Sequence, residues 1–265
     1  MKINSKQTIE DFGDQWNIFT KNEGYYGSTK VMVDICGSIF NPSNFIGRNV
    51  LDIGAGTGRL TNILVDMKAK HVYSVEPSRA FNVLLKVTEK NKQKITYIQS
   101  AGDNIPLNFK VDFAISIGVL HHILDPAPVC KRAYDLLEEN GEFLIWVYAK
   151  EGNELYLFFA NLMRLLTTKM HDNTLLKICK FLNFFLTIYC IACSKLKLPM
   201  FTYMKNHIAK LSNDVRVLTI FDQLNPEHAK YYTKIETIAL LEKAGFKNVK
   251  IEYRHKYSWT ALGKK

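Results

Sequence analysis

The stretch Val50-Leu51-Asp52-Ile53-Gly54-Ala55-Gly56-Thr57-Gly58-Arg59-Leu60-Thr61 decides the fold. A short apolar run contains an acidic residue, a glycine-rich turn follows, and apolar residues then recur with helical spacing at Leu60, Ile63, Leu64 and Met67. This order predicts a buried strand that enters a helix through a tight turn. Glycines suit the turn because the backbone must bend sharply and let a ligand lie against it.

The spacing of these glycines limits the ligand. Dinucleotide-binding turns have the pattern G-x-G-x-x-G, whereas this turn has G-x-G-x-G, with Asp52 two residues before the first glycine. A carboxylate there would repel a pyrophosphate and would suit a ligand with a cationic end. S-adenosylmethionine fits, since it has a sulfonium, an ammonium and a ribose but no phosphate. A second predicted strand at 71–75 is followed by Glu76, whose carboxylate can accept hydrogen bonds from both ribose hydroxyls.

With this ordered set of residues, the chain resembles the class I S-adenosylmethionine-dependent methyltransferases. The likeness continues at 101–106, where an acidic turn of that family flanks the adenine, and at 111–122, which looks like the fourth strand and the turn after it. The flanks at 22–26 and 257–260 look like a bacterial subgroup that is often found with surface-polysaccharide biosynthesis. The core of the resemblance covers residues 45–150 and says little about the methyl acceptor.

The resemblance implies a set of cofactor-binding residues and no metal. S-adenosyl-L-methionine, with S-adenosyl-L-homocysteine as the product, is expected to contact the glycine turn, the residues after the second and third strands, and the end of the fourth strand. The expected set is Asp52, Gly54, Ala55, Gly56, Gly58, Glu76, Pro77, Asp103, Asn104, Ser116, Ile117 and Gly118.

Alternating segments predict the fold class. Strands are expected at 49–53, 71–75, 94–99, 111–117, 142–148, 246–252 and 256–262, and helices at 57–67, 78–91 and 127–138. Repeated strand–helix units indicate a parallel sheet with helices on both faces. We therefore predict an α/β protein with a Rossmann-like, doubly wound, mostly parallel seven-stranded sheet, whose last two strands form an antiparallel edge hairpin.

Around this core we predict one domain with an insertion. Residues 1–45 form an N-terminal helical cover, 46–150 the S-adenosylmethionine-binding core, 151–225 an inserted helical cap, and 226–265 complete the core. The cover has Phe12, Trp16 and Phe19 at helical spacing, and a further helix is expected at 28–40. Thr233 and Glu236 have the spacing of a capping box before the late helix.

The cap region is apolar and basic. Helices are expected at 155–166 and 175–193, and the second contains an uncharged run of 14 residues, 181–194. Because about 20 apolar residues are needed to span a bilayer, this run predicts either a buried cap helix or an interfacial helix with basic flanks. Cys190 and Cys193 form a C-x-x-C in this run, for which packing on a helix face is favoured over a metal or redox site.

Net charge points to an anionic partner. The chain carries +10, and residues 155–216 contain nine Lys or Arg and two Asp, a net charge of +7. This excess fits a membrane surface, a phosphorylated lipid or a nucleotide sugar, although a merely solvated basic face is the alternative. Nucleic acid is not expected, because the aromatic motifs of RNA-binding modules are missing. Scattered cysteines and no apolar signal region after the N-terminus indicate a cytoplasmic protein, with peripheral contact at the inner face of the membrane.

The candidate catalytic residues are His121 and His122, which follow the fourth predicted strand. Methyl transfer needs close alignment in a dry site, and a hydroxyl acceptor also needs a base with a pKa near 7. The candidates for contact with the acceptor, each with a structural alternative, are Tyr25, Tyr26, His228, Tyr232 and Arg254. The polar segment 222–226 is expected to be a loop near the cofactor, and Asp125 is interpreted as a helix cap.

The sequence therefore predicts a methyltransferase that acts on a hydroxyl group of a sugar or of a lipid-linked saccharide. A free small metabolite or a lipid quinone is the alternative acceptor. A non-catalytic methyltransferase-like binding subunit is the alternative from another class, although the intact glycine motif argues against it.

Overall fold

The structure is a computed structural model that describes residues 5–226 and 228–265. Its centre is a seven-stranded sheet with the order β3-β2-β1-β4-β5-β7-β6. The first five strands along the chain are parallel, and β7 is antiparallel to both β5 and β6. The strands are β1 (Asn49–Ile53), β2 (His71–Val75), β3 (Ile95–Ile98), β4 (Val111–Ile117), β5 (Leu137–Tyr148), β6 (Lys247–Arg254) and β7 (Ser258–Lys264). The predicted fold class is confirmed, including the antiparallel hairpin at the sheet edge.

Helices cover both faces of the sheet and one end of it. The helices of the core are α1 (Ser5–Ile18), α2 (Thr29–Cys36), α3 (Arg59–Asp66), α4 (Phe81–Val87), α5 (Ala127–Leu136) and α10 (Lys234–Lys243). Those of the cap are α6 (Glu154–Thr167), α7 (Asp172–Lys195), α8 (Phe201–Asn206) and α9 (Asn213–Leu224). Short 3-10 turns are η1 (Pro42–Phe45), η2 (Glu89–Lys94), η3 (Leu120–His122) and η4 (Ile208–Lys210).

The alternation of side chains along each strand divides the core in two. Leu51 and Ile53 of β1 pack in a cluster with α5 and α10, whereas Val50 packs in a second cluster with α2 and α3. Asp52 shares the α3 side with Val50, because residues two apart on a strand lie on the same face. This placement decides what the Asp52 carboxylate can reach.

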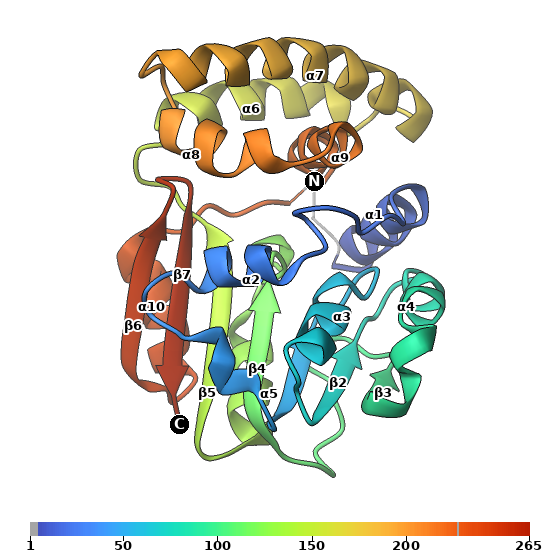
Figure 1. Ribbon diagram of the computed structural model, residues 1–265, viewed down its shortest axis with the longest axis vertical. Helices are drawn as coiled ribbons and strands as arrows, with labels where there is room; N and C mark the ends of the chain where they lie inside the picture. Colours follow the sequence, from blue (N-terminus) through green and yellow to red (C-terminus); the bar gives the residue numbers. More distant parts are fainter. Residues whose placement is uncertain (1–4, 227) are drawn as a thin grey trace.

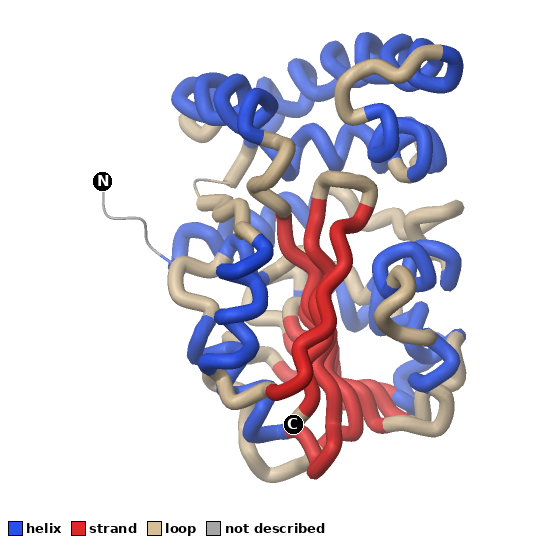
Figure 2. Tube along the Cα trace, turned by 90° about the vertical axis from the view of Figure 1, so that its left-hand side faces the viewer, coloured by secondary structure: helices blue, strands red, loops and turns tan. Residues whose placement is uncertain are grey.

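The cap lies beyond the carboxyl ends of the parallel strands. Figure 1 shows the arrowheads of β2 and β4 pointing toward α8 and α9, with α6 and α7 farther away. Figure 2, turned by 90°, shows the same helical layer at the end of the sheet. Since ligands of open α/β sheets bind at the carboxyl ends of the strands, the site is expected between this layer and the sheet.

Several element ends differ from the predicted ones for local reasons. Helix α2 ends at Cys36 rather than at residue 40, because Gly37 has a φ of +58° and leaves the helical conformation. Helix α4 ends at Val87, and η2 follows it. Thr88 caps that end, its hydroxyl donating to the Leu84 carbonyl oxygen. The β5 strand begins at Leu137, five residues before the prediction, with an irregularity between the pairs Val111–Leu137 and Phe113–Glu142.

The cap differs most from the prediction. Helix α7 has 24 residues, because it extends through lysines on both sides of the uncharged run. Helix α9 was not predicted, and it contains Asp222, Gln223 and Leu224, which were expected in a loop. Its start carries an ordinary signal, since the Ser212 side chain accepts a hydrogen bond from the Val215 N–H. The capping box of Thr233 and Glu236 at α10 is present as predicted.

Candidate functional site

A cavity of about 260 Å³ lies at the carboxyl ends of β1, β2 and β4. The glycine turn after β1 and helix α1 both line it. The structure brings together eight of the residues expected to bind cofactor. Those that line the cavity are Gly54, Ala55, Gly56, Glu76, Pro77, Asp103, Ile117 and Gly118.

The turn after β1 requires glycine at its closest points. Gly54 and Gly56 have φ values of +79° and +54°, a region that favours glycine. A Cβ on Gly54 would lie 2.5 Å from Val119 Cγ2, and one on Gly56 would lie 3.2 Å from Trp16 Nε1. The N–H groups of Gly54 and Ala55 both donate to the Val75 carbonyl oxygen at 2.9 Å, which ties the turn to β2.

Glu76 joins the turn to the segment after β2. Its Oε2 accepts from the Gly56 N–H at 2.8 Å, and its Oε1 accepts from the Ser78 N–H at 2.9 Å and from the Ser78 hydroxyl at 2.5 Å. An ionised carboxylate has about four acceptor positions, so Oε2 keeps capacity for a further donor. Glu76 thus faces the cavity with a fixed orientation and an available acceptor.

Asp52 does not line the cavity, contrary to its expected contact with a cationic ligand group. Its side chain points to the α3 side of the sheet, where Oδ2 accepts from the Thr61 hydroxyl at 2.7 Å. Burial raises the pKa of this carboxyl to about 6, although the Thr61 hydrogen bond and the Arg59 charge oppose the rise. Asp52 therefore supports the turn from the α3 side of the sheet. Its side chain points away from the cavity because residues 50 and 52 of a strand lie on the same face.

Three other expected cofactor residues lie around the cavity without lining it. Gly58, with a φ of +81°, packs against α4, where a Cβ would lie 2.5 Å from Thr88 Cγ2. Asn104 lies on an exposed turn after β3, and the Ser116 hydroxyl is buried against the Ile53 carbonyl oxygen at 3.4 Å.

Helix α1 supplies an apolar wall that the sequence indicated only as a cover. Thr8, Ile9, Phe12 and Trp16 line the cavity. The Phe12 and His122 rings lie 4.5 Å apart between centroids. The helical spacing of Phe12 and Trp16 was visible in the sequence, but nothing local to α1 indicates that it packs on the glycine turn.

The two candidate tyrosines face different hollows. Tyr26 lines the cavity, and the Arg59 guanidinium lies 4.0 Å from the centre of its ring. Tyr25 lines a wider, open groove of about 980 Å³ between α2, η4 and the end of β6. Segment 24–28 thus separates the two hollows.

The candidate histidines occupy different depths. His122 lines the cavity with 5% of its surface exposed, whereas His121 is fully buried and does not line it. His122 Nδ1 lies 3.0 Å from the His228 carbonyl oxygen, and its Nε2 has no hydrogen-bond partner in the described structure. The His121 ring packs against the Tyr148 ring, with the centroids 3.9 Å apart and the planes tilted by 38°. Only His122 is therefore placed to meet a ligand.

A buried polar cluster behind the histidines joins the cap to the sheet. Asp222 of α9 accepts from the Tyr148 hydroxyl at 2.6 Å and from the Gln15 amide at 3.1 Å. Arg164 of α6 donates through Nε to the Gln223 carbonyl oxygen at 2.6 Å. The sequence reasoning missed Tyr148, Gln15 and Arg164, because each comes from a different element and no local pattern links them.

Two further candidates for acceptor contact, Tyr232 and His228, make hydrogen bonds within the fold. Tyr232 is buried in the core, its N–H donates to the Tyr148 carbonyl oxygen at 2.8 Å, and its carbonyl oxygen accepts from the Trp259 indole at 3.1 Å. His228 contributes its carbonyl oxygen to His122 and does not line the cavity. Among the described residues, no group of three or more His, Cys, Asp or Glu could hold a metal ion.

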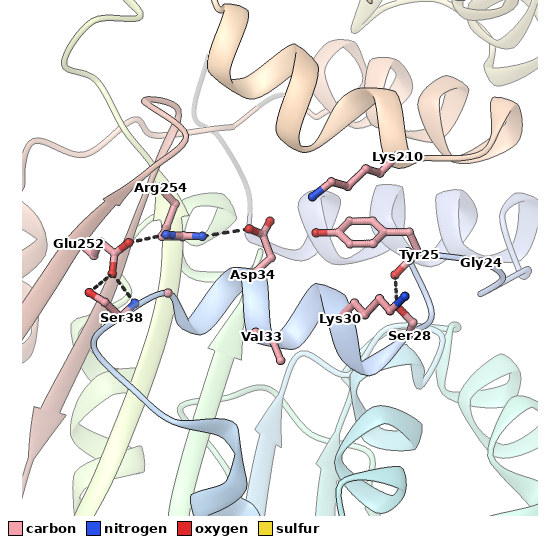
Figure 3. Close-up of a pocket in the computed structure, with 11 residues that line it drawn as sticks. Gly24, Tyr25, Ser28, Lys30, Val33, Asp34, Ser38, Lys210, Glu252 and Arg254 are labelled. Carbon is pink, nitrogen blue, oxygen red and sulfur yellow. Dashed lines mark hydrogen bonds and ion pairs between the residues drawn. The ribbon is translucent and has the colours of Figure 1, made fainter. Parts of the chain in front are cut away.

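Arg254, expected to contact the acceptor, lines the open groove and not the cavity. Figure 3 shows its guanidinium between Glu252 and Asp34, with the Tyr25 ring and Lys210 on the other side of Asp34. Arg254 Nη2 and His255 Nε2 lie 2.9 and 2.8 Å from Asp34 Oδ1, and His207 Nδ1 lies 3.6 Å from Asp34 Oδ2. Because His207 follows α8, this network fixes the cap to the core.

Replacing Asp34 by asparagine is expected to lower the free energy of unfolding by about 2 kcal/mol at pH 7. Burial alone would raise the pKa of Asp34, but hydrogen bonds from His207 and His255 and the charge of Arg254 hold it well below its usual range. The charged form is therefore stabilised in the folded state. This contribution is complete above the unfolded pKa of about 4 and is lost as the pH falls below it. Urea denaturation of both proteins at pH 7 and at pH 3.5 measures it, and an equal difference at the two pH values would refute it.

A family model described as "Methyltransferase domain" matches residues 38–251 of this chain. The curated proteins of similar sequence include a tRNA U34 carboxymethyltransferase of Shewanella halifaxensis, 28% identical over 110 residues, which are 40% of this chain and 33% of that protein. They also include a probable histone-arginine methyltransferase 1.3 of Arabidopsis thaliana, 39% identical over 79 residues, which are 29% of this chain and 15% of that protein. The matched part thus spans a third or less of these two relatives.

Solved structures extend the likeness to the whole fold. An S-adenosylmethionine-dependent methyltransferase from Aquifex aeolicus has a TM-score of 0.52 at 14% identity, over 99% of both chains. Magnesium protoporphyrin IX methyltransferase from Synechocystis, solved with bound S-adenosylhomocysteine, has a TM-score of 0.51 at 14% identity, over 100% of this chain and 89% of that one. At these identities the likeness shows that the fold is shared.

Proposed function

The chain belongs to the family of methyltransferase domains, and on that premise we propose that it methylates a hydroxyl group of a sugar or of a lipid-linked saccharide. The methyl donor is S-adenosylmethionine, and the other product is S-adenosylhomocysteine. The observation that carries the choice of a hydroxyl is the His122 ring at the cavity wall, with Nε2 free of any described partner.

The cavity has the chemistry that this cofactor needs. The glycine turn allows close approach of a ligand to the backbone, and Glu76 Oε2 keeps an acceptor position for a ribose hydroxyl. Apolar side chains of Ile123 and Val129 near Asp103 suit an adenine ring. When bound, the cofactor supplies an electrophilic methyl group on a sulfonium. The chain's own residues bind it, orient it and exclude water.

His122 has the tautomer that a general base needs. A carbonyl oxygen can only accept, so the neutral ring must carry its proton on Nδ1, which faces the His228 carbonyl, and Nε2 keeps a lone pair. Burial lowers the pKa of His122, although the Asp222 charge and the backbone hydrogen bond partly offset this. The ring is therefore neutral at pH 7 and able to accept the proton that an attacking hydroxyl must lose.

The charge of the cap supports an anionic, lipid-linked acceptor. Residues 155–216, with their net charge of +7, lie on the side of the cavity from which an acceptor would approach the carboxyl ends of the strands. A cytoplasmic location, peripheral to the inner face of the membrane, is part of this proposal. A free small metabolite or a lipid quinone would use the same base and would not need the basic cap.

Transfer of label from S-adenosylmethionine with a radioactive methyl group tests the proposal. Wild-type protein is given four acceptor pools: lipid-linked saccharides, soluble nucleotide sugars, quinones and bulk tRNA. Label that enters the lipid-linked saccharides is the expected result. Label in nucleotide sugars would support a sugar hydroxyl as the acceptor but would contradict the lipid-linked form. Label only in tRNA or quinone would overturn the acceptor class. Cofactor binding without transfer to any pool would favour a non-catalytic binding subunit.

A further inference from the structure

The cap presents rows of large apolar side chains to solvent. On α6 the row consists of Phe158, Phe159, Leu162, Leu165 and Leu166, and on α7 it consists of Phe181, Phe184, Phe185, Ile188 and Ile191. Each of these side chains is 51–68% exposed. We call these two rows the outer cap face. Monomeric soluble proteins rarely expose so many large apolar side chains on two helices of one layer, so the face is expected to have a partner.

The opposite face of α7 is already used for packing. Leu175, Cys179 and Cys193 are buried in the cap, and the Asn183 amide donates to Asn213 Oδ1 at 2.6 Å. Only 22% of the most apolar stretch of α7 is buried, whereas a core helix of this hydropathy would be mostly buried. The outer cap face is therefore an unpartnered surface rather than the back of a core.

By length and composition, α7 is the one helix among the described residues that could cross a membrane. Its packing argues against crossing. Asn183 lies in the middle of the helix and is also a hydrogen-bond acceptor for Arg216 Nε at 3.3 Å, so one side of α7 remains attached to α9. A helix with one packed polar face and one bare apolar face is expected to lie in the plane of a bilayer surface.

Lysines are aligned with the apolar row of α7. Lys177, Phe181, Phe184, Ile188, Ile191 and Lys195 follow one another at intervals of four and three residues, which keeps them on one side of a helix. Lys169 lies in the turn just after the end of α6, two residues beyond Thr167. Long lysine side chains can leave their carbon chains beside apolar surface while the ammonium groups reach lipid headgroups.

We propose that the outer cap face docks on an anionic phospholipid membrane, with the apolar rows in the headgroup–acyl boundary and the lysines on lipid phosphates. The charge pattern selects this occupant over a second copy of the chain, because pairing two such faces would bring like-charged lysines together. Such docking extends the proposed function, because it would hold the cap at the membrane surface that presents a lipid-linked acceptor. Docking itself needs neither cofactor nor acceptor.

Flotation with vesicles tests the docking without any turnover. Wild-type protein is mixed with vesicles of phosphatidylglycerol and phosphatidylethanolamine, or of phosphatidylcholine alone, at low and high salt. The wild type is expected to float with the anionic vesicles and to be released by salt or by neutral lipid. Phe184→Glu with Ile188→Glu is expected to reduce binding to anionic vesicles at least tenfold, and Lys177→Gln with Lys195→Gln to reduce it several-fold.

A control uses an apolar residue that is even more exposed but lies elsewhere. Ile235 on α10 is 79% exposed and lies outside the outer cap face, so Ile235→Glu is expected to bind vesicles like the wild type. Circular dichroism and cofactor binding should be unchanged in every variant. Vesicle binding that survives Phe184→Glu with Ile188→Glu would overturn the proposal. So would a wild type that ignores anionic vesicles, or one that is a dimer in solution and becomes monomeric in that double variant.

Discussion

Gly56→Val is expected to weaken the binding of S-adenosylhomocysteine by at least about 100-fold, which corresponds to about 2.7 kcal/mol. Gly56 lines the cavity at a φ of +54°, and any Cβ would approach Trp16 Nε1 to 3.2 Å. A branched side chain must therefore push Trp16 away or occupy the space of the cofactor. It would also strain the turn that presents the Gly56 N–H to Glu76. Calorimetric titration of both proteins measures the effect.

Gly47→Val is the matched control for backbone strain. Gly47 also has a positive φ, +72°, but no atom lies within 4 Å of the position of its Cβ, and it does not line the cavity. It should lose a similar amount of stability and keep the affinity of the wild type. Equal losses of affinity in the two variants would show that the effect is general destabilisation, and unchanged affinity in Gly56→Val would place the cofactor elsewhere.

His122→Asn is expected to lower kcat about 100- to 10,000-fold on the acceptor that the labelling experiment identifies, with cofactor affinity nearly unchanged. Asparagine can still donate toward the His228 carbonyl oxygen but has no basic nitrogen. His121→Phe is the comparison, because both ring nitrogens of His121 lack a described partner and the ring packs against Tyr148. That variant should fold and keep turnover within a few-fold. Similar kcat values for His122→Asn and the wild type would exclude His122 as the base.

The pH profile of turnover is expected to follow the protonation of His122. The active form of His122 is neutral, and burial, as the largest cause, lowers its pKa below 6.5. Activity should therefore persist below pH 6.5 and fall only as the pH drops through the lowered pKa, and His122→Asn should lose this acid limb. An acid limb with a midpoint above 6.5 would contradict the neutral, buried base.

The sequence predicts those parts of the site that lie close together along the chain. The turn at residues 54–56 and the acid at Glu76 are local signals of backbone shape and strand end, and the structure places them on one cavity. Asp52 shows where local reading fails. Its position in the motif is correct, but the alternation of β1 turns its carboxylate toward Thr61 and away from the cavity.

Contacts between distant elements were not predictable in this way. The groups around His122 include Phe12 of α1 and Asp222 of α9, and the second was expected in a loop because Asp, Gln and Asn precede a proline. The Arg254–Asp34 network likewise joins residues 220 positions apart. Periodicity identified the apolar cap helices, but it could not show which of their faces remains bare.

S-adenosylmethionine is expected to bind in the cavity that the glycine turn and α1 line. Trp16 lines that cavity, whereas Trp146 and Trp259 do not, so its fluorescence reports occupation of this site. Titration of wild type and Trp16→Phe with S-adenosylhomocysteine, followed by tryptophan emission and by calorimetry, is the most direct measurement. We predict a saturable change in emission at micromolar ligand in the wild type, and none in Trp16→Phe despite measurable heat of binding. The same change in both proteins, or no binding by the wild type, would contradict the account.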